Sequence, residues 1–143
     1  GGNRGVGRGS EVGQAGKRVL WGVVWAWSVV AVAMWRKSYS TNKALINGLI
    51  ADNVISTERV RDSMLQVDRG DYSRDMEEAY NDNPHGIGYN VTISAPHMHA
   101  HALELLQEVV TPGSRVLDVG SGSGYLCACL AMLLKDVDGT FKG

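Results

Sequence analysis

The block at residues 114–125, which reads SRVLDVGSGSGY, constrains the fold of this chain more than any other part of its sequence. The apolar run at 116–119 predicts a buried strand, and residues 126–134 predict the helix that follows it. The turn between them carries three alternating glycines, Gly120, Gly122 and Gly124. Glycines at such a turn let the backbone approach a ligand closely and leave N–H groups free at the helix N-terminus. The order of strand, glycine turn and helix therefore predicts an α/β fold with a nucleotide-type cofactor at the turn.

The spacing of the glycines separates two classes of cofactor. The dinucleotide fingerprint is G-x-G-x-x-G, whereas this chain has G-x-G-x-G, with Asp118 two residues before the first glycine. This pattern resembles the first motif of methyltransferases that use S-adenosyl-L-methionine, in which the loop faces the methionine end of the cofactor. The alternative is a glycine-rich turn that binds no ligand.

The composition is that of one small globular domain. The 143 residues are 44% hydrophobic and carry a formal net charge of −1, so no basic excess points to nucleic acid. Cys127 and Cys129 lie on the predicted helix after the glycine turn, and we expect them to be small core residues rather than metal ligands or a disulfide. So few cysteines are typical of a reducing compartment, and a cytoplasmic location is expected.

The first third of the chain differs from the rest. Residues 1–16 are rich in glycine and are predicted to be disordered, and residues 19–35 contain no charge. The uncharged segment is near the lower limit of about 17 residues for a membrane span, and it also has a signal-like Ala-Val-Ala. Tryptophans in its middle and basic residues on both sides disfavour these interpretations. We favour an extension at 1–33 that takes no part in the chemistry, followed by a domain at 34–143.

From Met34 onward the pattern is that of a folded domain. Thr41 or Asn42 is expected to cap a helix that ends at Asp52-Asn53 and buries one apolar stripe, Leu45, Ile46, Leu49 and Ile50. Ser56 or Thr57 is expected to cap a second helix that closes near Gly70 and buries Val60, Met64 and Val67. The polar segment 71–88 contains a proline and has no periodicity, so it is predicted to be a loop.

A second informative block spans residues 87–106. Val91 to Ile93 favour an extended segment, Ser94 occupies an N-cap position, and Pro96 suits a first helical turn. An apolar stripe at helical spacing follows, formed by Met98, Ala102, Leu105 and Val109. Thr92 and Ser94 would then lie at the positive end of a helix, which suits an anion such as a carboxylate. In the alternative interpretation Ser94 is only a cap.

Three histidines, His97, His99 and His101, follow at alternate positions. Side chains at i and i+2 of a helix do not share a face, so only the first and third could converge, and no glutamate lies between them in the H-E-x-x-H pattern. A metal site is therefore not expected. One imidazole that forms a hydrogen bond with a substrate or cofactor carboxylate is the favoured interpretation.

Together, VTISAPHMHAHALELL at 91–106 and VLDVGSGSGYL at 116–126 resemble the protein-L-isoaspartate (D-aspartate) O-methyltransferase family, and the resemblance covers about 34–134. It implies a doubly wound, Rossmann-like α/β sheet preceded by N-terminal helices. It also implies a repair enzyme, expected to be a monomer, that acts on isoaspartyl-containing proteins and peptides. The methyl group of S-adenosyl-L-methionine would pass to the free carboxylate of an L-isoaspartyl or D-aspartyl residue. The ester would then collapse to a succinimide that hydrolyses partly to aspartate.

The resemblance also assigns site residues. Ser94 matches the family's active-site serine, whose hydroxyl would orient the substrate carboxylate. The positions that match cofactor contacts are Val91, Thr92, Ile93, His99, Asp118, Gly120, Ser121, Gly122 and Ser123. Asp118 is expected to organise the glycine loop rather than to touch the methyl group.

Two departures from the family pattern matter. Val91 stands where alanine is expected, and the sequence has no second strand carrying the acidic residue that, roughly 20 residues past the loop, holds the ribose. Asp136 and Asp138 come too early to replace it. The chain is therefore expected to be the N-terminal part of a methyltransferase domain and to bind the cofactor weakly or not at all. A catalytically inactive form and a form tethered to a membrane through 19–35 remain alternatives.

Overall fold

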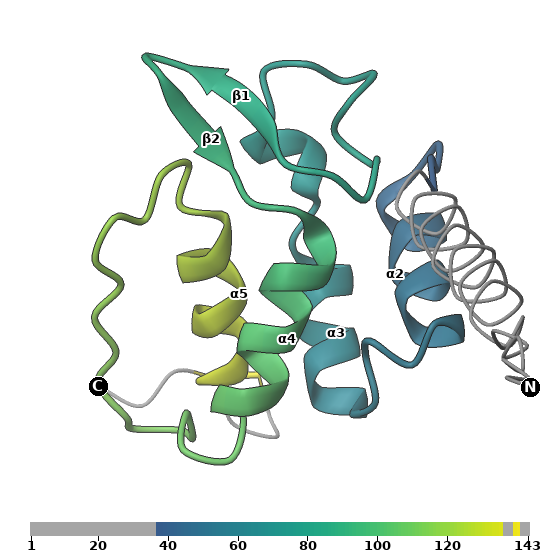
Figure 1. Cartoon of the computed structure of the whole chain (residues 1–143). Coiled ribbons are helices and arrows are strands. Elements are labelled where there is room, and N and C mark those ends of the chain that lie inside the picture. The colour runs from purple at the N-terminus through teal and green to yellow at the C-terminus, as the bar shows by residue number, and fades with distance from the viewer. Residues whose placement is uncertain (1–36, 136–138, 141–143) are drawn as a thin grey trace, which may run out of the picture. The chain divides into compact units, whose positions relative to one another are not determined.

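The computed structural model describes residues 37–135 and 139–140. The predictions for 1–33, for the uncharged segment 19–35 and for Asp136 and Asp138 lie outside these residues. The described elements, shown in Figure 1, are α2 (Asn42–Ala51), α3 (Glu58–Gln66), the 3-10 helix η2 (Arg69–Tyr72), β1 (His85–Gly88), β2 (Val91–Ile93), α4 (Pro96–Leu106) and α5 (Tyr125–Leu133).

The first predicted helix is confirmed as α2. The Thr41 hydroxyl caps it by accepting a hydrogen bond of 3.2 Å from the Ala44 N–H. Asp52 is the C-cap, and Asn53 follows with a φ of 57°, in the left-handed region that ends many helices. The predicted stripe faces inward: Leu45, Ile46 and Leu49 are buried and Ile50 is partly buried.

The second predicted helix is confirmed as α3, with Thr57 as its N-cap. Val60, Met64 and Val67 are buried as expected. The helix ends at Gln66, earlier than predicted, and residues 69–72 form η2 instead. The Asp68 side chain explains this break, because it accepts a hydrogen bond of 2.8 Å from the Gly70 N–H and so caps η2.

The prediction of a loop over 71–88 is wrong at both of its ends, where η2 and β1 extend into it. Strand β1 pairs with β2 in an antiparallel hairpin, with His85 opposite Ile93 and Gly86 opposite Thr92. Two of its four residues are glycine, so the strand carries no apolar alternation that a sequence pattern could detect. The turn residues Tyr89 and Asn90 have φ values of 53° and 57°, which suit a tight hairpin.

Helix α4 begins one residue later than predicted and turns a different side to the core. Ala95 is its N-cap and forms no side-chain cap, so the predicted cap at Ser94 is wrong, while Pro96 does lie in the first turn. The buried side consists of Pro96, His99, Ala100 and Leu103. The predicted stripe is wrong, since Met98, Leu105 and Val109 are 54%, 81% and 68% exposed. The polar His99 belongs to the true stripe because a buried arginine and a tyrosine pack against it.

Helix α3 contacts α2, α4 and α5, and their inward faces form one core (Figure 1). The buried Ser63 hydroxyl on α3 donates a hydrogen bond of 2.7 Å to the Cys129 carbonyl on α5. Cys129 is buried as predicted, but Cys127 is exposed, so the prediction that both cysteines lie in the core is half wrong. The two positions are i and i+2 on a helix and cannot share a face.

The strand predicted at 116–119 is wrong. These residues are irregular, and Leu117 and Val119 are each 85% exposed. A parallel strand needs partners on its edges, and the sheet found in the described residues consists of β1 and β2 alone. The helix after the turn is confirmed as α5, which begins one residue before the predicted start. Among the described residues, no helix is long and apolar enough to cross a membrane.

Candidate functional site

A cavity of about 270 Å³ lies where the β2–α4 junction meets the loop before α5. Its lining comes from the two blocks that stood out in the sequence, and these are separated along the chain by the end of α4 and the following loop. The residues that line it are Thr92, Ile93, Ser94, Met98, His99, Ala102, Asp118, Gly120, Ser121, Gly122, Ser123, Tyr125 and Leu126.

The cavity brings together most of the residues that the sequence assigned to a site. Nine of the ten line it, and the exception is Val91. Val91 lies next to the loop nonetheless, because a Cβ placed on Gly122 would be 3.8 Å from its Cγ1 atom. The exposed Val91 therefore flanks the glycine loop from the hairpin side.

Sequence reasoning missed four lining residues, Met98, Ala102, Tyr125 and Leu126. Met98 and Ala102 were assigned to the core stripe of α4, whereas the actual rotation of that helix turns them toward the cavity. Tyr125 directly follows the glycine motif, and its place next to the motif was the available signal. Arg69, which is fully buried against His99 and Tyr125, was not assigned to the site, and the available signal was its place in the D-R-x-x-Y element at 68–72, which resembles one of the family.

The glycine loop depends on backbone angles that other residues adopt only with strain. Gly120, Gly122 and Gly124 have φ values of 84°, 57° and 84°, and Gly124 is the N-cap of α5. No atom lies within 4 Å of a Cβ placed on Gly120 or Gly124, so the surroundings are open there. Conformation, rather than crowding, therefore requires these two glycines.

Asp118 brings a partly buried carboxylate to the cavity wall. Its Oδ2 atom accepts a hydrogen bond of 3.2 Å from the Cys127 thiol on α5. This hydrogen bond raises the pKa of the Cys127 thiol, because a thiolate would face a carboxylate. The contact connects the loop to the first turns of α5.

His99 is a strongly perturbed titratable group of the cavity. The residue is 9% exposed, and its Nδ1 atom lies 3.2 Å from Nη1 of Arg69. Burial, and then the Arg69 charge, lower its pKa from 6.5 to about 4. His99 is therefore neutral at pH 7 and serves as a hydrogen-bonding group rather than as a cation.

The other two histidines do not join the cavity. The Nδ1 atom of His97 lies 2.9 Å from Oδ1 of Asp82, which also accepts a hydrogen bond from the His97 backbone. His101 is exposed. In the part of the chain that the structure describes, no group of three side chains could hold a metal ion.

The cavity thus combines an anionic side chain, neutral hydrogen-bond donors and a glycine loop at the start of a helix. Asp118 suits an ammonium or hydroxyl group, while hydroxyls, backbone N–H groups and a neutral imidazole suit a carboxylate. Met98, Leu126 and Tyr125 add apolar surface. Such a site fits a small zwitterionic ligand with an apolar portion.

Comparisons with known proteins identify the same region. The family model for protein-L-isoaspartate(D-aspartate) O-methyltransferase matches residues 40–140. The chain is 51% identical over 100 residues to protein-L-isoaspartate O-methyltransferase of Caenorhabditis elegans, covering 70% of this chain and 44% of that protein. It is 50% identical over 97 residues to protein-L-isoaspartate O-methyltransferase 1 of Arabidopsis thaliana, covering 68% and 42%. The chain thus spans less than half the length of these relatives.

A solved structure agrees with the fold. It is that of a Plasmodium falciparum protein described as a protein-L-isoaspartate O-methyltransferase in complex with S-adenosyl-L-homocysteine. The TM-score is 0.64 at 46% identity, and the match covers 69% of this chain and 44% of that one. This likeness confirms the predicted α/β fold class. The matched segment includes both blocks that line the cavity, and on this evidence the chain belongs to the protein-L-isoaspartate (D-aspartate) O-methyltransferase family.

Proposed function

We propose that the protein transfers the methyl group of S-adenosyl-L-methionine to the free carboxylate of L-isoaspartyl and D-aspartyl residues in damaged proteins and peptides. One observation carries this proposal: a single cavity joins Ser94 and its neighbours to the glycine loop that follows Asp118. Family membership supports it, because the relatives are named for this reaction. In this proposal, residues 34–143 contribute the N-terminal part of the methyltransferase domain, and the protein acts as a cytoplasmic monomer.

The cavity fits one end of the cofactor. Its volume of about 270 Å³ lies just below the range of about 300–1,000 Å³ that is typical of small-molecule sites. It therefore suits the methionine portion of the cofactor, whose ammonium and carboxylate groups match Asp118 and the neutral donors. The glycine loop would hold this portion through the backbone around Gly120 to Gly122, together with Ser121 and Ser123. When bound, the cofactor supplies a methyl group on a positively charged sulfur.

The substrate itself supplies the nucleophile, so the protein needs no strong base. A carboxyl group with a pKa near 4 is ionised at pH 7 and can attack the methyl carbon directly. The remaining tasks are to align the carboxylate and to exclude water from it. We assign Ser94 to the first task, and its position in the cavity wall between the extended segment β2 and the start of α4 supports this. Its hydroxyl would donate a hydrogen bond to the carboxylate oxygen that does not attack.

The remaining site residues are assigned supporting roles. His99 would donate a hydrogen bond to a carboxylate, because burial keeps its imidazole neutral. Thr92 and Ile93 line the cavity from β2, and Val91 flanks the loop. Asp118 would order the loop and contact the ammonium group of the cofactor.

The test is transfer of labelled methyl from S-adenosyl-L-methionine to a peptide that contains one isoaspartyl residue, with the matching aspartyl peptide as the control. We expect the isoaspartyl peptide alone to be labelled, an outcome that would overturn the weak cofactor binding that the sequence predicts. Ser94→Ala should lower kcat by about 10- to 100-fold, because alignment is its role. Ser40→Ala, an exposed serine at the start of the described region, should change nothing. Equal labelling of both peptides, or an unchanged Ser94→Ala rate, would contradict the proposal.

A binding titration separates the remaining alternatives. Micromolar binding of S-adenosyl-L-methionine without transfer to any isoaspartyl peptide would identify a catalytically inactive member of the family. Association with membranes that resists carbonate extraction would identify a tethered form. Neither result is expected from a cytoplasmic repair enzyme.

A further inference from the structure

Arg69 is a fully buried cation directly behind the cavity. Its Nε atom donates a hydrogen bond of 3.0 Å to the Ala79 carbonyl, and its guanidinium carbon lies 5.4 Å from the centre of the Tyr125 ring. Among the described residues, Arg69 forms no ion pair with a carboxylate. A buried charge without a counter-ion costs several kcal/mol on the usual scale. Hydrogen bonds from the guanidinium to its neighbours must therefore offset that cost.

The contact with His99 fixes the proton on the imidazole. Nη1 of Arg69 lies 3.2 Å from Nδ1 of His99. A guanidinium has only donors, so the Nδ1 atom must accept this hydrogen bond. The neutral ring then carries its proton on Nε2. A protonated ring would instead set an N–H group against the N–H group of the arginine.

The same guanidinium also holds the corner that carries Ser94. Nη2 of Arg69 donates a hydrogen bond of 2.7 Å to the Ser94 carbonyl. The N-cap residue of α4, Ala95, supplies no capping side chain, and the Asp82 carboxylate accepts a hydrogen bond from the His97 N–H in the first turn instead. From η2, the arginine therefore fixes the Ser94 carbonyl, two residues before the first residue of the helix.

We propose that Arg69 is a positioning residue that locks His99 in its Nε2–H form, as a permanent hydrogen-bond donor at the cavity wall, and holds Ser94 in register with it. Its effect on methyl transfer rests on the proposed function. The locked proton on His99 does not, since it depends only on the folded chain.

Other charges near His99 modify this arrangement without reversing it. Arg69 approaches from η2, Asp118 from the loop before α5, and His97 from the same helix. The Tyr125 ring on α5 lies 5.0 Å away and is uncharged. Burial, Arg69 and His97 act to lower the pKa of His99, Asp118 acts to raise it, and the result is about 4.

The first test needs no variant. Nitrogen NMR of the full chain, labelled with ¹⁵N-histidine, reports which ring nitrogen carries the proton. We expect the His99 signals of an Nε2–H ring that does not titrate between pH 7.5 and pH 5. An Nδ1–H ring, or titration near pH 6.5, would overturn the proposal. A failure of methyl transfer in the unaltered chain would count against the proposed function and leave this result intact.

The second test removes and then restores the cation. Arg69→Met should raise the titration midpoint of His99 by one pH unit or more and mix the two tautomers. Arg69→Lys, which keeps a charge and a donor, should restore much of the wild-type signal. In the transfer assay Arg69→Met should lower kcat by about 10- to 100-fold, with a smaller change in KM.

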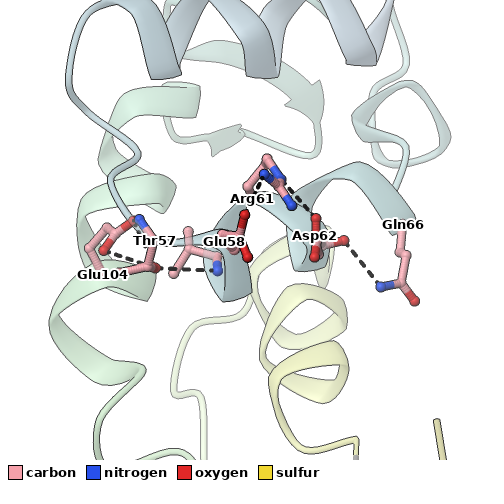
Figure 2. Close-up of polar contacts among 7 residues, drawn as sticks. Thr57, Glu58, Arg61, Asp62, Gln66 and Glu104 are labelled. Carbon is pink, nitrogen blue, oxygen red and sulfur yellow. Dashed lines mark hydrogen bonds and ion pairs between the residues drawn. The ribbon is translucent and has the colours of Figure 1, made fainter. Parts of the chain in front are cut away.

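Arg61→Met is the matched control, because the Arg61 side chain on α3 bonds, within the part of the chain that the structure describes, to Glu58 and Asp62 alone (Figure 2). It should leave both the His99 signals and kcat unchanged. An Arg69→Met protein that folds and keeps the wild-type tautomer and titration would overturn the proposal. If that variant does not fold, the His99 tautomer measured in the unaltered chain still tests the proposal.

Discussion

The carboxylate of Glu104 on α4 accepts hydrogen bonds from the backbone N–H and the hydroxyl of Thr57, the N-cap residue of α3, at 2.9 and 3.1 Å (Figure 2). The same carboxylate accepts a hydrogen bond of 2.8 Å from the Ser56 N–H. Burial acts to raise the pKa of Glu104, but these hydrogen bonds outweigh it and hold the pKa below its usual value. A residue 47 positions away thus completes the cap of α3 and ties α4 to it.

Glu104→Ala should lower the free energy of unfolding by about 1.5–3 kcal/mol, the usual worth of hydrogen bonds to a charged group. Urea unfolding at pH 7 measures this. Glu108→Ala, an exposed glutamate just beyond the same helix, should cost less than about 0.5 kcal/mol. The pKa of Glu104 is depressed in the folded state. The difference in free energy of unfolding between wild type and Glu104→Ala should therefore be largest above pH 4.5 and shrink as the pH falls below it. A gap independent of pH would contradict this role.

Arg59 joins the C-terminal ends of two helices. Its guanidinium donates hydrogen bonds to the carbonyls of Gln107 and Val110, after α4, and to that of Leu133, the last residue of α5. Carbonyls at helix C-terminal ends have no partners within the helix, and a cation there also complements the helix dipoles. Arg59→Met should therefore cost about 2–3 kcal/mol of stability. Arg61→Met, two positions along the same helix and with a side chain that is 36% exposed, should cost about 0–1 kcal/mol in the same thermal or urea unfolding series. Equal losses of stability in the two variants would contradict the role assigned to Arg59.

Gly124 starts α5 with a φ of 84° and has open space around its Cα. Gly124→Ala should cost about 1–2 kcal/mol through backbone strain alone. Gly86→Ala meets equally open space, without a left-handed backbone, and should be neutral or slightly stabilising. Circular dichroism during thermal unfolding compares the two. A neutral Gly124→Ala would show that the loop does not require this conformation.

The stability of the protein should depend on His99 between about pH 6.5 and pH 4. The folded ring has a pKa of about 4, whereas the unfolded ring takes up a proton near 6.5. The unfolded state therefore binds more protons in this window, and stability falls as the pH is lowered through it. At about 1.4 kcal/mol per pH unit, the loss approaches 3 kcal/mol.

Urea unfolding of wild type and His99→Gln at several pH values between 7 and 4 tests this dependence. The variant should show the shallower slope over the window. His101→Gln removes an exposed histidine from the same helix and should keep the wild-type slope. Identical slopes for wild type and His99→Gln would rule out the buried neutral ring.

Local patterns were enough to predict the helices and most of the site. Thr41 and Thr57 cap α2 and α3 as expected, because capping depends on residues within one helical turn. The glycine loop and the segment 92–94 were identified from spacing and from resemblance, and nine of the ten assigned residues line one cavity. Their roles there remain predictions.

The tertiary structure decided what spacing could not. The rotation of α4 was predicted wrongly, since two stripes fit its sequence and only packing against Arg69 and Tyr125 selects the one that contains His99. Strand β1 forms because β2 lies beside it, and residues 116–119 stay irregular because no strand among the described residues pairs with them. Sequence alone determined which residues can cap, turn or bind, because those properties are local. The partner that each residue contacts depends on packing between distant segments. Arg69 lies beside the cavity because η2 packs against His99 of α4 and Tyr125 of α5.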